Sequence, residues 1–414
     1  MNETLIEIGQ RAQTAADQVA LLDTATKNRA LGAMADALRT HQNEIITANQ
    51  ADLAQVTDMP KKFTDRLMVN EQRVADMANG LRTVARLADP TARIDRGWIN
   101  ADGLQILQRR VPLGVIGIIF EARPNVTVDA TGLTFKSGNA VILRGGKEAI
   151  RTNTALANIL RAALEKQGLP ADAVQLIEDT SHELAQEMMN LTDYIDVLIP
   201  RGGRGLIQRV VKTATVPVIE TGAGNCHVYI DKDAALQMAT DITVNAKVQR
   251  PSVCNAAEKL LIHRDVAAKF LPTITQALLD HGVQLRGDDQ ARVIVPQMQA
   301  ASNADWDTEY NDLVMAVKVV DSLDDAIQHI NHHSTHHSEV IVTDSIERGR
   351  AFQQRINSAC VYVNASTRFT DGGVFGFGAE IGISTQKFHA RGPMGLDQLT
   401  TIKYEITGSG QVRH

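Results

Sequence analysis

The sequence lacks the features that mark secreted and membrane proteins. Its 414 residues include only three cysteines, Cys226, Cys254 and Cys360, an odd and sparse set that does not suit a disulfide-stabilised scaffold. No stretch approaches the roughly 20 apolar residues that a membrane-spanning helix needs. The first seven residues have neither the basic start nor the apolar run of a signal peptide. We therefore expect a cytoplasmic protein that does not interact with membranes.

The chain also lacks an excess of positive charge. Its 42 Lys and Arg against 48 Asp and Glu give a net charge of −6, which argues against a nucleic-acid-binding surface but leaves small anionic ligands open. The hydrophobic fraction of 44% and the charged fraction of 22% are those of a globular protein. A chain of this length exceeds one ordinary core, so we expect two or three structural units.

Neither of the common nucleotide-binding fingerprints is present. There is no Gly-x-Gly-x-x-Gly after a strand and no Walker loop. Instead, two glycine pairs flanked by cations follow expected strands: Arg144-Gly145-Gly146-Lys147 and Arg201-Gly202-Gly203-Arg204. Glycine pairs allow a ligand to approach the backbone, and the second pair opens a helix, whose amides favour anions. Cations at these turns suit the 2′-phosphate of NADP, although each turn alone could equally be a solvated loop.

Strand-like and helix-like segments alternate from Val111 onward, after a helical region that spans residues 3 to about 95. The first series of expected strands is 115–120, 140–143, 174–177, 197–199 and 217–219, with helices at 128–136, 153–167, 182–190 and 205–213. A second series runs from 227 to 364. Such alternation predicts parallel strands in doubly wound α/β sheets. Two further segments, 104–109 and 400–406, alternate in polarity as edge strands do.

One cysteine lies in a segment suited to chemistry. Cys254 follows Pro251, between an expected helix that ends at Lys247 and an expected strand that starts near Lys259. Proline interrupts the helix because it lacks an amide hydrogen, and a thiol on such a loop can face a cleft. A lone cysteine is more often a small buried hydrophobe than a nucleophile, which is what we expect of Cys226 and Cys360.

Five stretches along the chain follow the pattern of one enzyme family. They are 120–125, 219–227, 245–255, 363–373 and 384–395. In this order they resemble the aldehyde dehydrogenase superfamily, and within it the branch that reduces an acyl phosphate in proline biosynthesis. The resemblance implies two doubly wound α/β domains and a small β extension. The NADP-binding domain would comprise residues 1–98 and 112–224, the catalytic domain 225–396, and the extension 99–111 and 397–414, which would join the subunits of a homo-oligomer.

The resemblance also implies the reaction, which is reduction of L-glutamyl 5-phosphate by NADPH to L-glutamate 5-semialdehyde and phosphate. Cys254 would carry a thioester, since thiolate is strongly nucleophilic and its ester accepts hydride better than a carboxylate does. Asn125 would form an oxyanion hole with the Cys254 amide. Glu220 matches the general base of hydrolytic members, and Glu309 falls where a carboxylate holds the nicotinamide ribose.

Substrate contacts can be suggested only from position along the chain. Arg123 and Arg250 are candidates for binding the phosphate, and residues 366–368 for the amino-acid end of the substrate. The substrate, an acyl phosphate of glutamate, further implies functional coupling to glutamate 5-kinase.

Three alternatives stay open. A hydrolytic aldehyde dehydrogenase would use Glu220 as base and would not depend on phosphate. A cofactor-free cysteine hydrolase would need a histidine base, for which His227 and His389 are the candidates. A scaffold without catalysis would not need Cys254.

A histidine cluster at 332, 333, 336 and 337 has spacings found in zinc sites. It has no acidic third ligand at a fitting spacing, so we expect a polar loop and no metal.

Overall fold

The computed structural model describes residues 2–56 and 61–413, without the side chains of residues 61–63 and 204. The chain forms two compact units. Unit 1 comprises Met1–Thr221, Gly376–Gly382 and Met394–His414, and unit 2 comprises Gly222–Phe375 and Ile383–Pro393. Each unit contains a parallel sheet covered by helices, so the predicted α/β fold class is confirmed.

Unit 1 begins with helices whose buried faces recur every three or four residues. They are α1 (Glu3–Val19), α2 (Thr24–Thr40), α3 (Gln42–Leu53), α4 (Lys61–Leu67) and α5 (Glu71–Arg86). Leu31, Met34 and Leu38 place one side of α2 entirely in the core. Asp23 begins this helix, because its carboxylate accepts a hydrogen bond from the Thr26 amide. These helices form a scaffold against the sheet.

The sheet of unit 1 has the strand order β5-β4-β3-β6, and all of its pairs are parallel. Its strands are β3 (Val115–Phe120), β4 (Ala140–Arg144), β5 (Val174–Leu176) and β6 (Val197–Arg201), with helices α6 (Asn125–Lys136), α7 (Ile150–Lys166), α8 (His182–Met188) and α9 (Arg204–Thr213). Every residue of β3 is buried, as expected for a strand covered on both faces. The strand predicted at 217–219 contributes only one bridge, from Val218 to Leu198.

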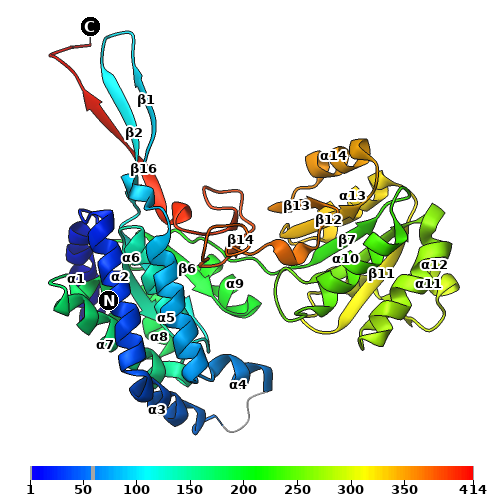
Figure 1. Ribbon diagram of the computed structural model, residues 1–414, viewed down its shortest axis with the longest axis horizontal. Helices are drawn as coiled ribbons and strands as arrows, with labels where there is room; N and C mark the ends of the chain where they lie inside the picture. The colour runs from blue at the N-terminus through cyan, green and yellow to red at the C-terminus, as the bar shows by residue number, and fades with distance from the viewer. Residues whose placement is uncertain (1, 57–60, 414) are drawn as a thin grey trace. The chain divides into compact units, whose positions relative to one another are not determined.

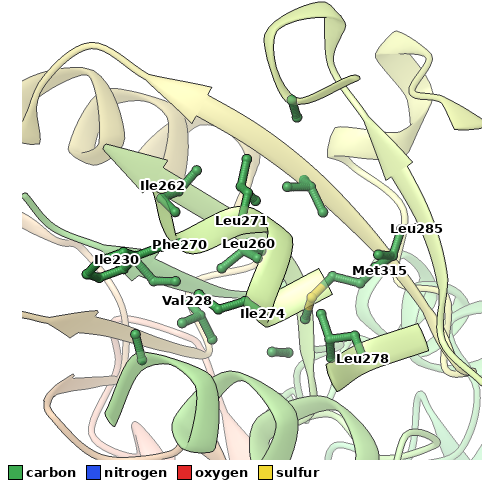
Figure 2. Close-up of a cluster of buried hydrophobic side chains, with 14 of the residues drawn as sticks. Val228, Ile230, Leu260, Ile262, Phe270, Leu271, Ile274, Leu278, Leu285 and Met315 are labelled. Atoms are coloured by element: carbon green, nitrogen blue, oxygen red, sulfur yellow. The ribbon is translucent and has the colours of Figure 1, made fainter. Parts of the chain in front are cut away.

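Unit 2 contains seven parallel strands in the order β10-β9-β11-β8-β7-β12-β13. The strands are β7 (Cys226–Ile230), β8 (Ala257–His263), β9 (Gln284–Gly287), β10 (Gln299–Ala300), β11 (Val314–Val320), β12 (Ser338–Val342) and β13 (Cys360–Val363). The helices are α10 (Leu236–Val248), α11 (Arg264–Asp280), α12 (Asp289–Ile294), α13 (Leu323–His333) and α14 (Ile346–Arg355). Two residues from each central strand, Val228 and Ile230 of β7 and Leu260 and Ile262 of β8, share a buried cluster with the apolar face of α11 (Figure 2). A short antiparallel pair, β14 (Ile383–Ser384) with β15 (Gly392–Pro393), completes the unit.

A three-stranded antiparallel arm extends from unit 1 (Figure 1). It consists of β1 (Ile94–Ile99), β2 (Gln105–Pro112) and β16 (Thr400–Thr407). Strands β2 and β16 were predicted, whereas β1 was not. Apolar side chains remain exposed on the arm, among them Ile99 and Ile406, and Trp98 packs edge-on against Tyr404. Within the described residues no helix combines the length and apolarity needed to cross a bilayer.

A buried ion pair fixes the segment that leads into the arm. The Lys27 ammonium of α2 lies 3.0 Å from a carboxylate oxygen of Asp89, and both side chains are at most 2% exposed. Thr91 accepts a second hydrogen bond from Lys27 at 2.9 Å. Hydrogen bonds from Thr91 and the charge of Lys27 outweigh burial and hold the pKa of Asp89 below its ordinary value. The charged pair therefore connects α2 to the start of the arm.

We expect Asp89→Asn to lower the free energy of unfolding by about 3 kcal/mol, because it leaves the buried Lys27 ammonium without its anion. The shift of the urea midpoint, followed by circular dichroism, measures this change. The exposed pair of Asp36 with Arg82 provides the control, since Asp36→Asn should change stability by less than about 1 kcal/mol. Equal effects of the two substitutions would contradict a stabilising role for the buried pair.

Candidate active site

The nucleophile candidate, Cys254, lies in a short loop of unit 2. The loop follows the end of α10 at Val248 and precedes the start of β8 at Ala257. Helix α10 cannot continue through Pro251, which has no amide hydrogen to donate. Cys254 forms no disulfide bond and is partly exposed. The loop therefore presents a thiol at the carboxyl end of a helix and the amino end of a buried strand.

The segment before β7 passes directly against the backbone of Cys254. A Cβ atom added at Gly224 would lie 1.4 Å from the Cys254 carbonyl oxygen, so no side chain fits there. The same oxygen accepts a hydrogen bond from the Cys226 thiol, at 3.1 Å. Burial raises the pKa of the Cys226 thiol well above its ordinary value, which keeps it a donor. Cys226 thus packs and positions the loop, whereas the sequence suggested packing alone.

A second segment of unit 2 holds the other side of the loop. The side chain of Asn255 donates to the Thr370 carbonyl at 2.7 Å, and the Thr367 hydroxyl donates to the Asn255 carbonyl at 2.7 Å. The intervening Arg368 donates through Nε to Gln249 at 2.7 Å. Burial and the charge of Arg250 lower the pKa of Arg368. Two guanidinium groups thus lie near each other beside the cysteine loop.

The charges of Cys254 and Asp371 act in the opposite direction and raise the pKa of Arg368. The guanidinium group of Arg368 therefore lies among charges of both signs beside the cysteine loop.

Glu309 is fixed against the same part of unit 2. Its carboxylate accepts a hydrogen bond from the Gly224 amide at 2.7 Å. Two buried charged residues of β8 hold the segment around Glu309. Lys259 donates to the Thr308 carbonyl at 2.7 Å, and Glu258 accepts from the Asn311 amide at 3.1 Å. Burial raises the pKa of Glu258 and lowers that of Lys259. The structure thus places Glu309 next to the segment that contacts Cys254.

In unit 1, Asn125 is the first residue of α6, three positions earlier than the helix start predicted at 128. Its side-chain amide donates to a carboxylate oxygen of Asp129, one turn further along, at 2.8 Å. Burial raises the pKa of Asp129, while the hydrogen bond from Asn125 and the charge of Arg201 lower it. Sequence reasoning missed Asp129, although the spacing of four residues would have indicated the contact once the helix start was known.

Glu220 follows the single bridge residue Val218 in unit 1 and is partly buried. Burial raises the pKa of its carboxyl group. A raised pKa favours the protonated form, which cannot accept a proton as a general base until it ionises.

The first glycine pair forms a tightly packed turn. A Cβ added at Gly145 would lie 2.2 Å from Asn153 Nδ2, which is a buried donor without a partner among the described residues. Lys147 is exposed, whereas Arg144 is buried and donates to the carbonyls of Thr180 and Ser181. A Cβ at Gly146 would lie 2.6 Å from Glu148.

A surface hollow of about 760 Å³ lies immediately after this turn, between α3 and α7. Asn43, Thr47, Ile150, Thr154 and Glu178 contribute to its lining. Its volume lies within the range of roughly 300–1,000 Å³ that small-molecule sites occupy. The first turn thus combines a tight backbone, a cation and adjacent space.

The second glycine pair is already bonded to an anionic side chain. The Glu121 carboxylate accepts a hydrogen bond from the Gly203 amide at 2.8 Å, and a Cβ at Gly202 would lie 2.7 Å from the same carboxylate. The backbone of Arg204 begins α9, but its side chain lies outside the described residues. Arg201 lies against Gly382, where an added Cβ would be 2.9 Å from its guanidinium. The helix terminus therefore binds a side chain of its own unit, which sequence reasoning missed.

Of the four histidines predicted to lie in a polar loop, His332 and His333 are the last residues of α13, whereas His336 and His337 lie in the loop before β12. The ring centroids of His329 and His333 are 4.5 Å apart, and those of His227 and His329 are 5.7 Å apart. His227 is fully buried beside Glu339, with 3.1 Å between Nδ1 and the carboxylate, and burial lowers its pKa well below the ordinary value. The described residues contain no group of three or more metal-ligating side chains.

Comparison with known proteins identifies the family to which the chain belongs. The model of the aldehyde dehydrogenase family matches residues 2–312, which is more than half of the chain. The chain belongs to the aldehyde dehydrogenase family. Gamma-glutamyl phosphate reductase of Limosilactobacillus reuteri is 78% identical over 413 residues and 100% of both chains, and that of Enterococcus faecalis is 56% identical over 411 residues and 99% of both.

A solved structure agrees along the whole chain. The crystal structure of gamma-glutamyl phosphate reductase from Thermotoga maritima has a TM-score of 0.97 at 47% identity, covering 99% of this chain and 100% of the other. The resemblance inferred from five sequence stretches is thus confirmed. Membership of the family makes the chain an oxidoreductase that uses a nicotinamide cofactor. The roles of individual residues stay predictions.

We expect Gly224→Ala to reduce kcat for aldehyde oxidation about 100-fold, because the added Cβ must displace the Cys254 backbone by about 1 Å or more. Initial rates with a nicotinamide nucleotide measure the effect, and circular dichroism checks the fold. Gly32→Ala on α2 is the control, since a Cβ there meets nothing within 4 Å. A Gly224→Ala variant with wild-type kcat would show that the loop does not need this contact.

Proposed function

We propose that the chain reduces L-glutamyl 5-phosphate with NADPH to L-glutamate 5-semialdehyde and phosphate, as the second step of proline biosynthesis from glutamate. The observation that carries the proposal is the Cys254 loop, which Gly224, Cys226 and Asn255 hold in place. Arg368, bonded to Gln249 beside this loop, supplies a cation for a phosphate leaving group. The relatives that match along the whole chain are gamma-glutamyl phosphate reductases, which supports the same reaction.

In this proposal Cys254 acts as the nucleophile. Its thiolate attacks carbon 5 of the substrate, a C–S bond forms, and the C–O bond to phosphate breaks with its electron pair leaving on phosphate. Arg250 and Arg368 bind the departing group. NADPH, when bound, supplies a hydride to the thioester carbon. The C–S bond then breaks, which returns the thiolate and releases the aldehyde.

The other site residues have separate roles. The Asn125 amide and the Cys254 backbone N–H donate hydrogen bonds to the acyl oxygen, each typically worth about 3 kcal/mol in the transition state. Glu220 has no water to activate in this direction, and burial raises the pKa of its carboxyl group. We therefore assign it no role as a base in the reduction. Glu309, held by the Gly224 amide, is the candidate for the nicotinamide ribose.

We further propose that unit 1 binds NADPH and that the arm joins the subunits of a homo-oligomer. The tight turn at Gly145 and Gly146, the exposed Lys147 and the adjacent hollow support a nucleotide site with a cation for the 2′-phosphate. Arg144 would act by shaping the loop at Thr180. The second turn, at Gly202 and Gly203 with the residues beside them, would contact the cofactor through its backbone and not through charge. The Gly203 amide already donates a hydrogen bond to Glu121.

The exposed apolar residues of the arm supply the surface that a second copy of the chain would cover. An acyl phosphate of glutamate is made by a kinase that acts on glutamate. Because acyl phosphates hydrolyse readily, we expect functional coupling between this chain and glutamate 5-kinase. None of the three cysteines forms a disulfide bond, which supports a reducing, cytoplasmic compartment.

The reverse reaction tests the proposal against a hydrolytic aldehyde dehydrogenase. Glutamate 5-semialdehyde, supplied as its cyclised equilibrium mixture, and NADP should yield NADPH only when inorganic phosphate is present. Cys254→Ala should abolish the signal, and Glu220→Gln should change it less than about tenfold, because no water attack is involved. Equal rates without phosphate would overturn the proposal and make Glu220 a base.

Arg368 should control phosphate binding. We expect Arg368→Gln to raise the KM for phosphate in the reverse direction at least about tenfold, since it removes a charge-assisted hydrogen-bond donor. The KM for NADP should stay within about twofold. Arg292→Gln, on a partly exposed arginine of α12, is the matched control. An unchanged KM for phosphate in Arg368→Gln would exclude this residue from the phosphate site.

A further inference from the structure

Three neighbouring strands of unit 2 follow segments that contain predicted site residues. In the sheet order β11-β8-β7, the segment before β7 contains Gly224, the loop before β8 contains Cys254, and the segment before β11 contains Glu309. The three strands are parallel, so these segments lie at the same edge of the sheet. Strand β8 lies between the other two, and its first residues are therefore placed to contact the segments on either side.

A β-bulge distorts the start of β8. Cys226 of β7 pairs with Ala257, but the next residue of β7 pairs with Lys259, so Glu258 is an extra residue in the pairing. Consecutive residues of a regular strand point to opposite faces, yet Glu258 and Lys259 both bond to the segment before β11. Bulges re-aim side chains in this way and are common beside functional sites.

Glu258 joins the base of the cysteine loop to this segment. One of its carboxylate oxygens lies 2.8 Å from the Lys247 ammonium, and both side chains are fully buried. Lys247 is the next-to-last residue of α10, so the ion pair connects the two ends of the loop that contains Cys254. The other oxygen accepts a hydrogen bond from the Asn311 amide at 3.1 Å. A single carboxylate thus contacts both segments.

The segment before β11 is connected to the cysteine loop a second time. Asn311, which Glu258 holds, has a φ of 54°, in the left-handed region that few residues other than glycine adopt. Two positions earlier, the Glu309 carboxylate accepts a hydrogen bond from the Gly224 amide, and Gly224 packs against the Cys254 carbonyl. The position of this segment therefore depends on Glu258 at one point and on Gly224 at another.

We propose that Glu258 is a positioning residue that holds the Cys254 loop and Glu309 in one geometry. The inference rests on the proposed function, in which Cys254 is the nucleophile and Glu309 binds the nicotinamide ribose. An apolar side chain would fill the place of Glu258 without the cost of burying a charge. A carboxylate offers what such a side chain lacks, which is two acceptor oxygens, one for each segment.

The competing explanation is that Glu258 and Lys247 only stabilise the fold. Substitution of one partner alone would leave a buried charge unpaired, so two double variants are compared. Lys247→Met/Glu258→Gln removes the ion pair but keeps an oxygen that can accept from the Asn311 amide. Lys247→Met/Glu258→Met removes this acceptor as well, with a side chain of similar length.

Both double variants should lower kcat of the reverse reaction about 100-fold, because the loop that carries Cys254 is no longer fixed at its base. The Kd for NADP, measured by isothermal titration calorimetry, should separate them. It should stay within about twofold of the wild type for Lys247→Met/Glu258→Gln. It should rise about tenfold for Lys247→Met/Glu258→Met, because only this variant releases the segment that contains Glu309.

Asp231→Asn is the matched control. Asp231 is a buried carboxylate that follows the opposite end of β7, and it accepts a hydrogen bond from Arg348 Nε at 2.6 Å. This variant should lower the midpoint of thermal unfolding but keep kcat and the Kd for NADP within about twofold. Double variants that lose stability but keep the wild-type kcat, or that have the same Kd as each other, would overturn the inference.

Failure of the proposed function gives a different result. NADPH formation by the wild type without phosphate would overturn the proposed reduction of an acyl phosphate, yet the kcat values of the variants could still be compared in that reaction. The Kd comparison needs no turnover at all. A Kd that does not respond to the side chain at position 258 would overturn the positioning role of Glu258 alone.

Discussion

The contact between Gly224 and the Cys254 carbonyl is the constraint on which the cysteine loop depends. Because a Cβ at Gly224 would overlap that oxygen, the segment before β7 must have no side chain at this point. The same glycine donates its amide to Glu309, and the thiol of Cys226 donates to the Cys254 carbonyl. The nucleophile, a predicted cofactor ligand and the first strand of unit 2 therefore hold one another in place.

Charge is divided between the units. Unit 2 places Arg250 and Arg368 beside its thiol, an environment for a departing anion. The candidate residues of unit 1 include the carboxylates of Asp129 and Glu220, and burial raises the pKa of both.

Many of the strands and the cysteine loop could be predicted from sequence, because fully buried strands have continuous apolar runs and proline interrupts helices. The continuous apolar run of β3 and the break at Pro251 needed no tertiary information. Strand β1 was missed because Asp95, Arg96 and Gly97 interrupt its apolar pattern. Gly97 pairs with Leu107 of β2, whose side chain leaves little room for a Cβ at this position. Asp129 was missed because the predicted helix began at 128, after Asn125. The proximity of Arg368 to Arg250 could not be read locally, since 118 positions along the chain separate them.

The arm also imposes an order on synthesis. Strands β1 and β2 form a hairpin within the first 112 residues, but their third partner, β16, begins only at Thr400. While the ribosome makes unit 2, the edge of β2 that β16 will cover has no strand to pair with. Unpaired edges recruit other chains, and domains generally fold in the order of their emergence. A nascent chain that stalls before Thr400 thus presents an unpaired strand edge, so the synthesis of β16 protects the protein from aggregation as well as completing the arm.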